Sequence, residues 1–409
     1  MPVRGGTNAA FERLAFVGAM VFVASIPLEG LLHLGILGSL AKGGGAVLVV
    51  GAFFAFLGGG LRVRRTDGSI LLFGAFVAWA VLSYFWSADK SLTLGRASTN
   101  MQLFLATLVL WQFLGTAPRV RVALQTFVVS TFFGSVYSIL ARHPHDATGV
   151  ARYSVGGPNS FGIYVVWAML AAYWLLGQTP SKRWKQFYAL FFVVGTIEVF
   201  DTASRTALVV LCIAVAIALA DRRLLRPRNV AIAVVIAAVS GIAILHVVSS
   251  RQLERLGTVS EAAASGANGR TTQWRLALDV FSAHPVEGLG AAVFRDYSEA
   301  QIGISRVAHN SFLGVAADLG VVGLVLFAAM FVFACRNLHY LPPTTRRLWF
   351  GLAAVWLLGA NTLTWENQKF TYFVLAVLAA QSVLVVTGRA REAAWAAPAA
   401  ARSEEAHPG

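Results

Sequence analysis

The feature that most constrains this chain is a series of long apolar blocks separated by short charged segments. A helix needs about 20 apolar residues to cross the roughly 30 Å hydrocarbon core of a bilayer. Twelve blocks approach that length, and they are residues 12–30, 41–60, 69–87, 98–115, 120–141, 159–177, 185–200, 204–221, 229–248, 310–335, 346–364 and 369–387. The first block lacks a small-residue cleavage site, so we expect a retained helix and not a signal peptide.

Composition supports the same conclusion. Charged residues make up 13% of the 409 residues, whereas soluble domains carry about 25%. This excludes a soluble enzyme, a disordered chain and a coiled coil. The sequence therefore predicts an all-α polytopic membrane protein with about twelve transmembrane helices.

The positions of Lys and Arg predict the orientation of these helices. With the N-terminus in the cytoplasm, cytoplasmic segments hold 20 of the 33 Lys and Arg residues, and short outer loops hold 7. Cytoplasmic loops of membrane proteins carry such an excess. We therefore expect both termini in the cytoplasm, and we interpret the net charge of +14 as a topology signal and not as a sign of nucleic-acid binding.

One outer loop is long enough to fold. The expected domains are nine spans within residues 1–248, a loop over 249–308, three spans within 309–387 and a disordered cytoplasmic tail over 388–409. In the loop, Trp274, Ala277, Leu278 and Phe281 recur at helical spacing, which predicts an amphipathic helix over residues 271–283. A second short helix is expected near residues 291–302.

Arginines gather at the outer ends of the predicted spans. They are Arg152, Arg205, Arg270, Arg275 and Arg306. The planar guanidinium matches phosphate oxygens and stays charged when partly buried, and Arg270 also precedes a helix N-terminus, which favours anions. If these ends converge, they form an anion site at the membrane boundary. The alternatives are that Arg152 and Arg306 only contact lipid headgroups, and that Arg275 pairs with Asp279.

His309 is the candidate general base. It lies three residues after Arg306 and joins the long loop to the tenth span. An imidazole with a pKa near 6.5 can accept a proton at neutral pH. The alternative is a histidine that only donates or accepts a structural hydrogen bond.

Metal and cofactor chemistry are not predicted. The outer acidic residues form no acid-x-acid pair of the kind that a divalent cation favours, and no Gly-x-Ser-x-Gly hydrolase motif is present. Glu198 and Asp318 lie inside predicted spans, where carboxylates are costly. Asp318 is nine residues after His309, about half a helical revolution away, so we do not expect it to be the direct partner of His309.

Several short motifs occur together in order. They are Arg152 with Gly157-Pro158-Asn159, Ser204-Arg205-Thr206, Gly269-Arg270 with Trp274, Pro285 with Gly288 and Gly290, and His309-Asn310. With the long loop between spans nine and ten, this order resembles the O-antigen ligase and polymerase superfamily, a GT-C-like class of membrane glycosyltransferases. The Asn-Pro-Asn that is familiar in that superfamily appears here as Gly157-Pro158-Asn159.

The resemblance implies a metal-independent, inverting glycosyltransferase of the bacterial inner membrane with its active site facing the periplasm. The donor would be an O-antigen polysaccharide on undecaprenyl diphosphate, and the acceptor of a ligase would be a sugar hydroxyl of lipid A–core. His309 matches the histidine that acts as general base. Arg205 and Arg270 match arginines that hold the donor diphosphate, and Asn159 and Asn310 are expected in supporting positions.

Other functions stay open. An O-antigen or exopolysaccharide polymerase and a protein O-oligosaccharyltransferase would share the donor and differ in the acceptor. A transporter of lipid-linked glycans would show broken helices and ionisable groups near the membrane midplane, whereas most ionisable groups here lie at the ends of the spans. The expected partners are the lipid-linked donor, the acceptor and membrane lipids, with no nucleic acid and no cofactor.

Overall fold

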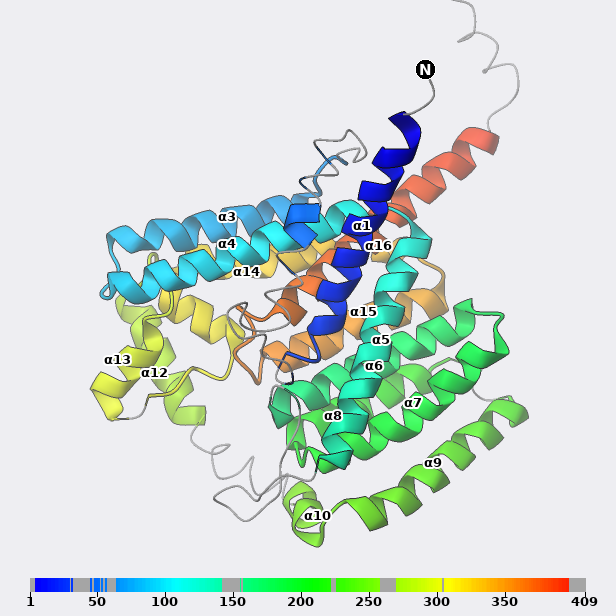
Figure 1. Cartoon of the computed structure of the whole chain (residues 1–409). Coiled ribbons are helices and arrows are strands. Elements are labelled where there is room, and N and C mark those ends of the chain that lie inside the picture. Colours follow the sequence, from blue (N-terminus) through cyan, green and yellow to red (C-terminus); the bar gives the residue numbers. More distant parts are fainter. Residues whose placement is uncertain are drawn as a thin grey trace, which may run out of the picture.

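The computed structural model describes residues 4–29, 64–141, 157–221, 226–257, 270–303 and 305–396, and a few single positions between them. These residues form helices and turns, without a β-strand, which confirms the predicted all-α class (Figure 1). The helices are α1 (Arg4–Ser25), α3 (Gly68–Leu82), η2 (Ser83–Phe85), α4 (Lys90–Phe113), α5 (Ala117–Leu140), α6 (Pro158–Gln178), α7 (Lys182–Asp201), α8 (Arg205–Leu219), α9 (Pro227–Val247), α10 (Ser250–Gly257), α12 (Arg270–Ala283), α13 (Phe294–Ile302), α14 (Ser311–Cys335), η3 (Leu338–Tyr340), α15 (Pro343–Ala360) and α16 (Lys369–Ala396).

Among the residues that the structure describes, six segments are long and apolar enough to cross a membrane. They are Gly68–Phe85, Ala117–Leu140, Pro158–Gln178, Pro227–Val247, Ser311–Tyr340 and Lys369–Gly388. Arg205–Leu219 is a shorter apolar helix. These are the features of a multi-pass membrane protein. The count of twelve spans stays a prediction, and most of the predicted second span, 41–60, lies outside the described residues.

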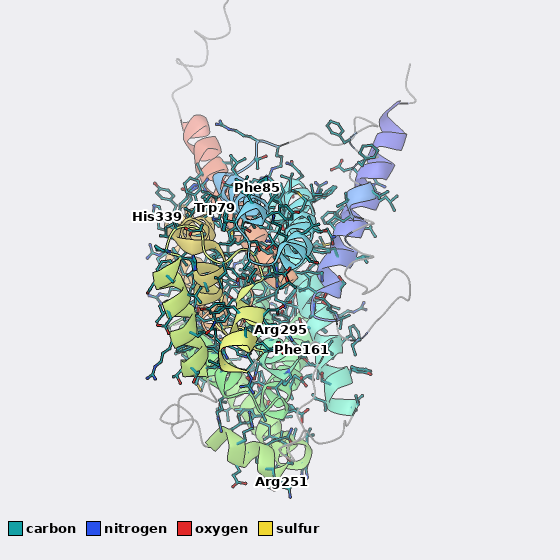
Figure 2. All side chains as sticks on the ribbon, turned by 90° about the vertical axis from the view of Figure 1, so that its left-hand side faces the viewer. Trp79, Phe85, Phe161, Arg251, Arg295 and His339 are labelled. Carbon is teal, nitrogen blue, oxygen red and sulfur yellow. The ribbon has the colours of Figure 1, made fainter. Side chains whose placement is uncertain are left out.

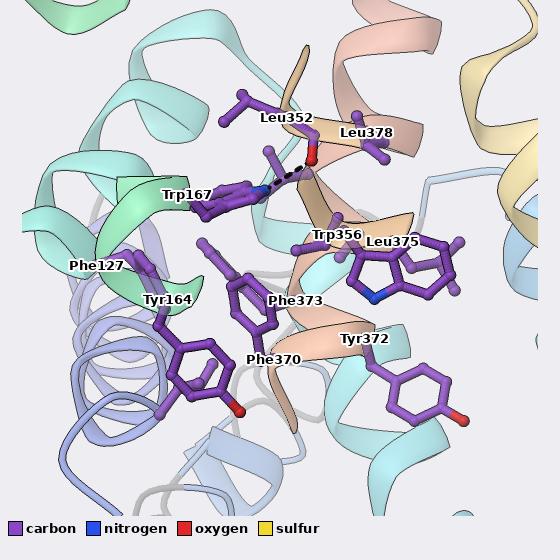
Figure 3. Close-up of a cluster of buried hydrophobic side chains, with 14 of the residues drawn as sticks. Phe127, Tyr164, Trp167, Leu352, Trp356, Phe370, Tyr372, Phe373, Leu375 and Leu378 are labelled. Carbon is purple, nitrogen blue, oxygen red and sulfur yellow. Dashed lines mark hydrogen bonds between the residues drawn. The ribbon is translucent and has the colours of Figure 1, made fainter. Parts of the chain in front are cut away.

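The core is aromatic and centres on α16. Phe127 of α5 stacks on Phe370 and Phe373 of α16, with ring centroids 5.6 and 5.1 Å apart. Trp167 of α6 packs edge-on against the same two rings, and its Nε1 donates to the Leu352 carbonyl of α15 at 3.0 Å (Figure 3). Because the indole N–H has a backbone partner, a large ring can be fully buried where four helices meet.

The helix bundle has two ends, named here after one residue at each. At the Arg336 end, Arg336 forms an ion pair with Asp67, and Arg119 forms one with Glu12. At the His309 end, Lys369 forms an ion pair with Glu29. In Figure 1, α12 and α13 lie at the ends of α3, α4 and α14. Figure 2 looks onto that side and shows Arg295 on α13 and Arg251 on α10.

Helix α14 is broken at Gly320, which has a positive φ of 63°. The break frees backbone carbonyls, and the chain that follows α12 supplies donors to them. Leu289 N donates to Ala317 O at 3.0 Å, and Gly290 N donates to Asp318 O at 2.8 Å. Trp79 of α3 adds its Nε1, 2.9 Å from Leu319 O. The segment that follows α12 is therefore bound to α14, which begins two residues after His309.

Two glycines allow this close approach. Gly288 and Gly290 have positive φ, and a Cβ on Gly288 would lie 2.4 Å from the Asp318 backbone. A Cβ on Gly290 would lie 2.5 Å from Ser87 Oγ. Only glycine combines that conformation with such close backbone contact. The Gly288 and Gly290 motif therefore positions this segment against α14 and α3–α4.

Asp318 caps a helix of the loop. Its Oδ2 accepts from Ala292 N and its Oδ1 from Phe294 N, each at 2.9 Å. Helix α13 begins at Phe294, and its own N-cap residue, Val293, has no side chain that can accept these bonds. The carboxylate is thus satisfied by two backbone donors, which explains why an acidic residue is tolerated in α14.

Replacing Asp318 should therefore destabilise the protein. Asp318→Ala leaves two N–H groups without acceptors, at a cost of about 1–3 kcal/mol for each donor that stays buried. Asp318→Asn keeps one oxygen and should cost less. Thermal unfolding in detergent should show Asp318→Ala below Asp318→Asn, and Asp318→Asn below wild type. Equal midpoints for the three proteins would refute the capping role.

The amphipathic helix lies where the sequence predicts it, but the predicted buried face is wrong in part. Leu278 is 49% exposed, whereas Gln273, Ala277 and Val280 are buried. Gln273 accepts a hydrogen bond from Ser298 of α13 at 3.0 Å. A buried polar link between the two loop helices turns α12 away from the orientation that apolar spacing alone suggests.

Candidate functional site

His309 is held between two buried neighbours at the start of α14. Ala308 is 1% exposed and packs in a small core with Ala277 and Val280 of α12. Asn310 is the N-cap of α14, and its Oδ1 accepts from Phe312 N and Leu313 N at 3.0 and 3.2 Å. His309 itself is only partly buried and has a φ of 51°. Few residues other than glycine adopt this conformation, and such strain is concentrated at functional sites.

Burial and two arginines lower the pKa of His309. Burial lowers the pKa of His309 below its ordinary value, and the positive charges of Arg270 and Arg306 lower it further. The imidazole is therefore neutral at neutral pH and able to accept a proton. Arg270 and Arg306 therefore lie close enough to His309 to influence its protonation.

Arg270 is the first residue of α12. Its side chain is partly buried, and burial lowers the pKa of the guanidinium from its ordinary value, although arginine stays protonated in proteins. The N–H groups of the first helical turn lie beside it. An anion at this position would meet a guanidinium and the positive end of a helix, close to His309.

Arg205 is the first residue of α8 and follows a tight turn. Ala203 has a φ of 45°, and Ser204 caps the helix by accepting from Ala207 N at 3.3 Å. Arg205 Nε donates to the Arg255 carbonyl of α10 at 3.0 Å. The turn and α10 thus fix the guanidinium at a second helix N-terminus of the same end.

Contacts through α6 connect the start of α8 to the start of α14. Gly162 of α6 packs so closely on Ala207 that a Cβ would lie 2.7 Å from the alanine methyl. Ser160, also on α6, accepts from Trp365 Nε1 at 3.2 Å. Trp365 N in turn donates to Ser311 Oγ at 2.7 Å. The N-termini of α6, α8 and α14 therefore lie at one end of the bundle, as the sequence predicts.

The remaining predicted site residues lie in different environments. Arg306 is exposed and acts on the charge of His309. Asn159 is partly buried at the start of α6, next to Ser160, and Asn310 serves as a helix cap.

Arg275 is exposed on α12, and no ion pair with Asp279 is present in the described part of the chain. Arg152 lies outside the described residues.

Sequence reasoning missed the turn between α15 and α16. Two of its buried residues, Trp365 and Glu366, are 1% and 8% exposed and lie against the start of α14. The signal in the sequence was a tryptophan and a carboxylate together in a very short outer turn. That pattern alone does not reveal which helix the turn contacts.

Among the described residues, no group of three or more His, Cys, Asp or Glu side chains could hold a metal ion. A shallow hollow lined by residues of α8 and α15, Arg346 and Phe350 among them, lies elsewhere, at the Arg336 end. The site at the His309 end thus offers a neutral imidazole, guanidinium groups and helix N-termini. Together these can bind an anionic phosphate group and remove a proton from a neighbouring hydroxyl.

Comparison with known families identifies a domain. Residues 189–328 match the model of the O-antigen ligase family (Wzy_C), which confirms the resemblance seen in the sequence. The match runs from α7 to α14 and includes Arg205, Arg270, Arg275, Arg306 and His309. It ends before the turn that carries Trp365 and Glu366.

A curated relative extends the similarity. The chain is 22% identical over 292 residues to the exopolysaccharide production protein ExoQ of Rhizobium meliloti (strain 1021). The aligned region is 67% of this chain and 66% of the relative, so the chain spans slightly less than two thirds of the relative's length.

Proposed function

We propose that the chain is an O-antigen ligase, a metal-independent inverting glycosyltransferase. It would move O-antigen polysaccharide from undecaprenyl diphosphate to a sugar hydroxyl of lipid A–core in lipopolysaccharide biosynthesis. The observation that carries the proposal is the position of His309. A neutral imidazole lies between a folded loop and a membrane helix, with two arginines close enough to lower its pKa, inside the segment that matches the O-antigen ligase family.

The proposed mechanism follows from these charges. His309 accepts the proton of the acceptor hydroxyl while the oxygen attacks the anomeric carbon from the face opposite the diphosphate. The bond from that carbon to the phosphate oxygen breaks, and the diphosphate leaves with both electrons. Arg270 and Arg205 stabilise the negative charge that develops on the leaving group, so the step needs no metal cation. Attack from the opposite face inverts the anomeric configuration.

The topology belongs to the same proposal. The His309 end faces the periplasm, where a lipid-linked donor would present its diphosphate at the membrane boundary. Both chain termini then lie in the cytoplasm of a bacterium whose inner membrane holds the protein. Arg226 at the start of α9, Arg336, Arg346 and Arg347 then lie on the cytoplasmic side, in agreement with the excess of Lys and Arg expected there.

A polymerase is the second candidate, and a protein O-oligosaccharyltransferase would use the same donor. The name of the relative, an exopolysaccharide production protein, favours polymer synthesis as an alternative to ligation. Deleting the gene distinguishes the two. A ligase deletion should leave bare lipid A–core and accumulate lipid-linked polymer, whereas a polymerase deletion should leave core that carries one repeat unit.

A transporter is less well supported. The break in α14 is a feature that transporters share. Here the carbonyls at the break accept hydrogen bonds from the loop segment 285–290 and from Trp79. The break therefore serves to attach the loop, and nothing in the described residues places a substrate there.

Metal independence gives a direct prediction. Because guanidinium groups and helix N-termini supply the positive charge, transfer should continue in excess EDTA without added cations. Purified protein should show the same rate of glycan transfer with EDTA and with Mg²⁺. A loss of activity that Mg²⁺ or Mn²⁺ restores would contradict the mechanism.

A further inference from the structure

Glu366 is a buried carboxyl group that the proposed mechanism does not use. Its side chain lies in the turn between α15 and α16 and is 8% exposed. Oε1 accepts a long hydrogen bond of 3.4 Å from Asn367, and Oε2 has no partner within the part of the chain that the structure describes. A buried carboxylate oxygen without a donor is costly, so it needs a proton or a ligand.

The position of this carboxyl group is close to His309. A Cβ placed on Gly314 would lie 3.6 Å from Glu366 Oε1 and 3.9 Å from the Ala308 side chain. Gly314 is one helical turn after Asn310, and Ala308 directly precedes His309. Glu366 therefore lies against the first turn of α14, beside Gly314.

The charged and titratable groups around Glu366 come from three helices. They are Arg96 of α4, Asp318 of α14 and Tyr372 of α16. Both oxygens of Asp318 already accept from α13, and the Tyr372 hydroxyl donates to the backbone carbonyl of Glu366 at 2.5 Å. Neither group satisfies Oε2.

The protonation of Glu366 follows from this environment. Burial raises the pKa of Glu366 to about 7, and the Asp318 carboxylate acts in the same direction. Hydrogen bonding to the backbone N–H of Glu366 and to Ser311, together with the charge of Arg96, opposes this rise. Protonated and ionised forms are therefore both present near neutral pH. In the ionised form, Oε2 is a buried acceptor to which the described residues donate no hydrogen bond.

We propose that Glu366 binds a sugar hydroxyl of the substrate beside His309, through its free carboxylate oxygen. The inference rests on the proposed glycosyl transfer and adds a binding residue to that site. Sugar hydroxyls are donors, and a hydrogen bond to an ionised carboxylate is shorter and stronger than one between neutral groups. The hydroxyl belongs either to the acceptor or to the first sugar of the donor. Glu366 makes and breaks no covalent bond.

The test is Glu366→Gln, which keeps the size of the side chain and removes its charge. Equilibrium binding of two probes is measured with purified protein, namely lipid A–core and an undecaprenyl-diphosphate-linked glycan. Affinity for one probe should fall by roughly tenfold to hundredfold, the range for a lost charge-assisted hydrogen bond. Weaker lipid A–core binding assigns the hydroxyl to the acceptor, and weaker binding of the linked glycan assigns it to the donor. Unchanged affinity for both probes would overturn the inference.

A matched control and a transfer assay separate this inference from the proposed function. Glu29→Gln removes another carboxylate at the same end, one that already pairs with Lys369, and should leave both affinities unchanged. If Glu366→Gln weakens binding but the wild-type protein transfers no glycan, the binding role stands and the proposed enzyme function fails. If the wild type transfers glycan and Glu366→Gln has wild-type Michaelis constants, the function stands and the binding role fails.

Thermal unfolding tests the state of the carboxyl group without any substrate. The pKa of Glu366 in the folded protein, about 7, exceeds the value of 4.5 for an unperturbed glutamate. The stabilisation from the protonated form is complete below the unfolded pKa and is lost as pH rises through the folded pKa. The unfolding temperature of the wild type should therefore fall relative to that of Glu366→Gln as the pH rises from about 5 to about 8. A difference that does not change with pH would contradict a buried, unpartnered carboxyl group.

Discussion

His309→Ala should fold and insert normally, bind the donor and lose glycan transfer by about 10²–10⁴-fold, the usual contribution of a general base. His309→Gln should not restore the rate, because an amide can donate and accept hydrogen bonds but cannot take up a proton. The rate is measured as transfer from a lipid-linked donor by purified protein. His284→Ala provides the matched control, since His284 is an exposed histidine of the same loop and should leave the rate unchanged.

The pH dependence gives an independent test of the same role. Because burial and two arginines lower the pKa of His309, kcat/KM should rise with pH and level off, with a midpoint below the ordinary histidine value of about 6.5. Arg306→Gln removes a positive charge and should move that midpoint upward. An active Gln variant together with a profile that has no ascending limb would show that His309 only orients the acceptor.

Arg270→Ala should weaken use of the donor by roughly tenfold to hundredfold, because it removes a charge-assisted contact of about 1.5–3 kcal/mol with the diphosphate. Arg205→Ala should have a similar effect. Lys at either position should rescue only in part, since an ammonium group lacks the planar fork of donors. The measurements are the Michaelis constant for the donor and the binding of undecaprenyl diphosphate.

An arginine from the same loop serves as control for these variants. Arg295 is an exposed residue of α13 whose Nε donates to Ser305 Oγ at 3.1 Å, so Arg295→Ala should keep the wild-type Michaelis constant. Arg270→Ala removes a positive charge near His309, so it should also raise the midpoint of the pH profile. Wild-type donor use by both Arg270→Ala and Arg205→Ala would refute the diphosphate site.

Much of the fold was accessible from the sequence because hydrophobic length and helical periodicity are local properties. Blocks of apolar residues predicted the helices, and the spacing of Trp274 and Ala277 predicted α12. Local spacing could not give the rotation of α12. That rotation depends on the hydrogen bond between Gln273 and Ser298, two residues on different helices.

For the candidate site, too, local features were predictable from the sequence and contacts between helices were not. Arginines at helix starts and a histidine at a loop junction carry chemistry that residue type alone suggests, so Arg270 and His309 could be named in advance. Asp318 could only be marked as costly, because the donors that satisfy it come from α13. Glu366 was one outer acid among many. Its significance depends on a contact with Gly314 and on burial, both of which arise only when the turn packs against α14.

Reconstitution in liposomes tests whether this protein transfers a lipid-linked glycan through His309. Wild-type protein and His309→Ala are placed in liposomes with a labelled undecaprenyl-diphosphate-linked glycan and lipid A–core, in the presence of EDTA. We expect a labelled lipid A–core product with inverted anomeric configuration from the wild type, and little or none from the variant. Donor that the wild type leaves unconsumed, or equal product from both proteins, would contradict it.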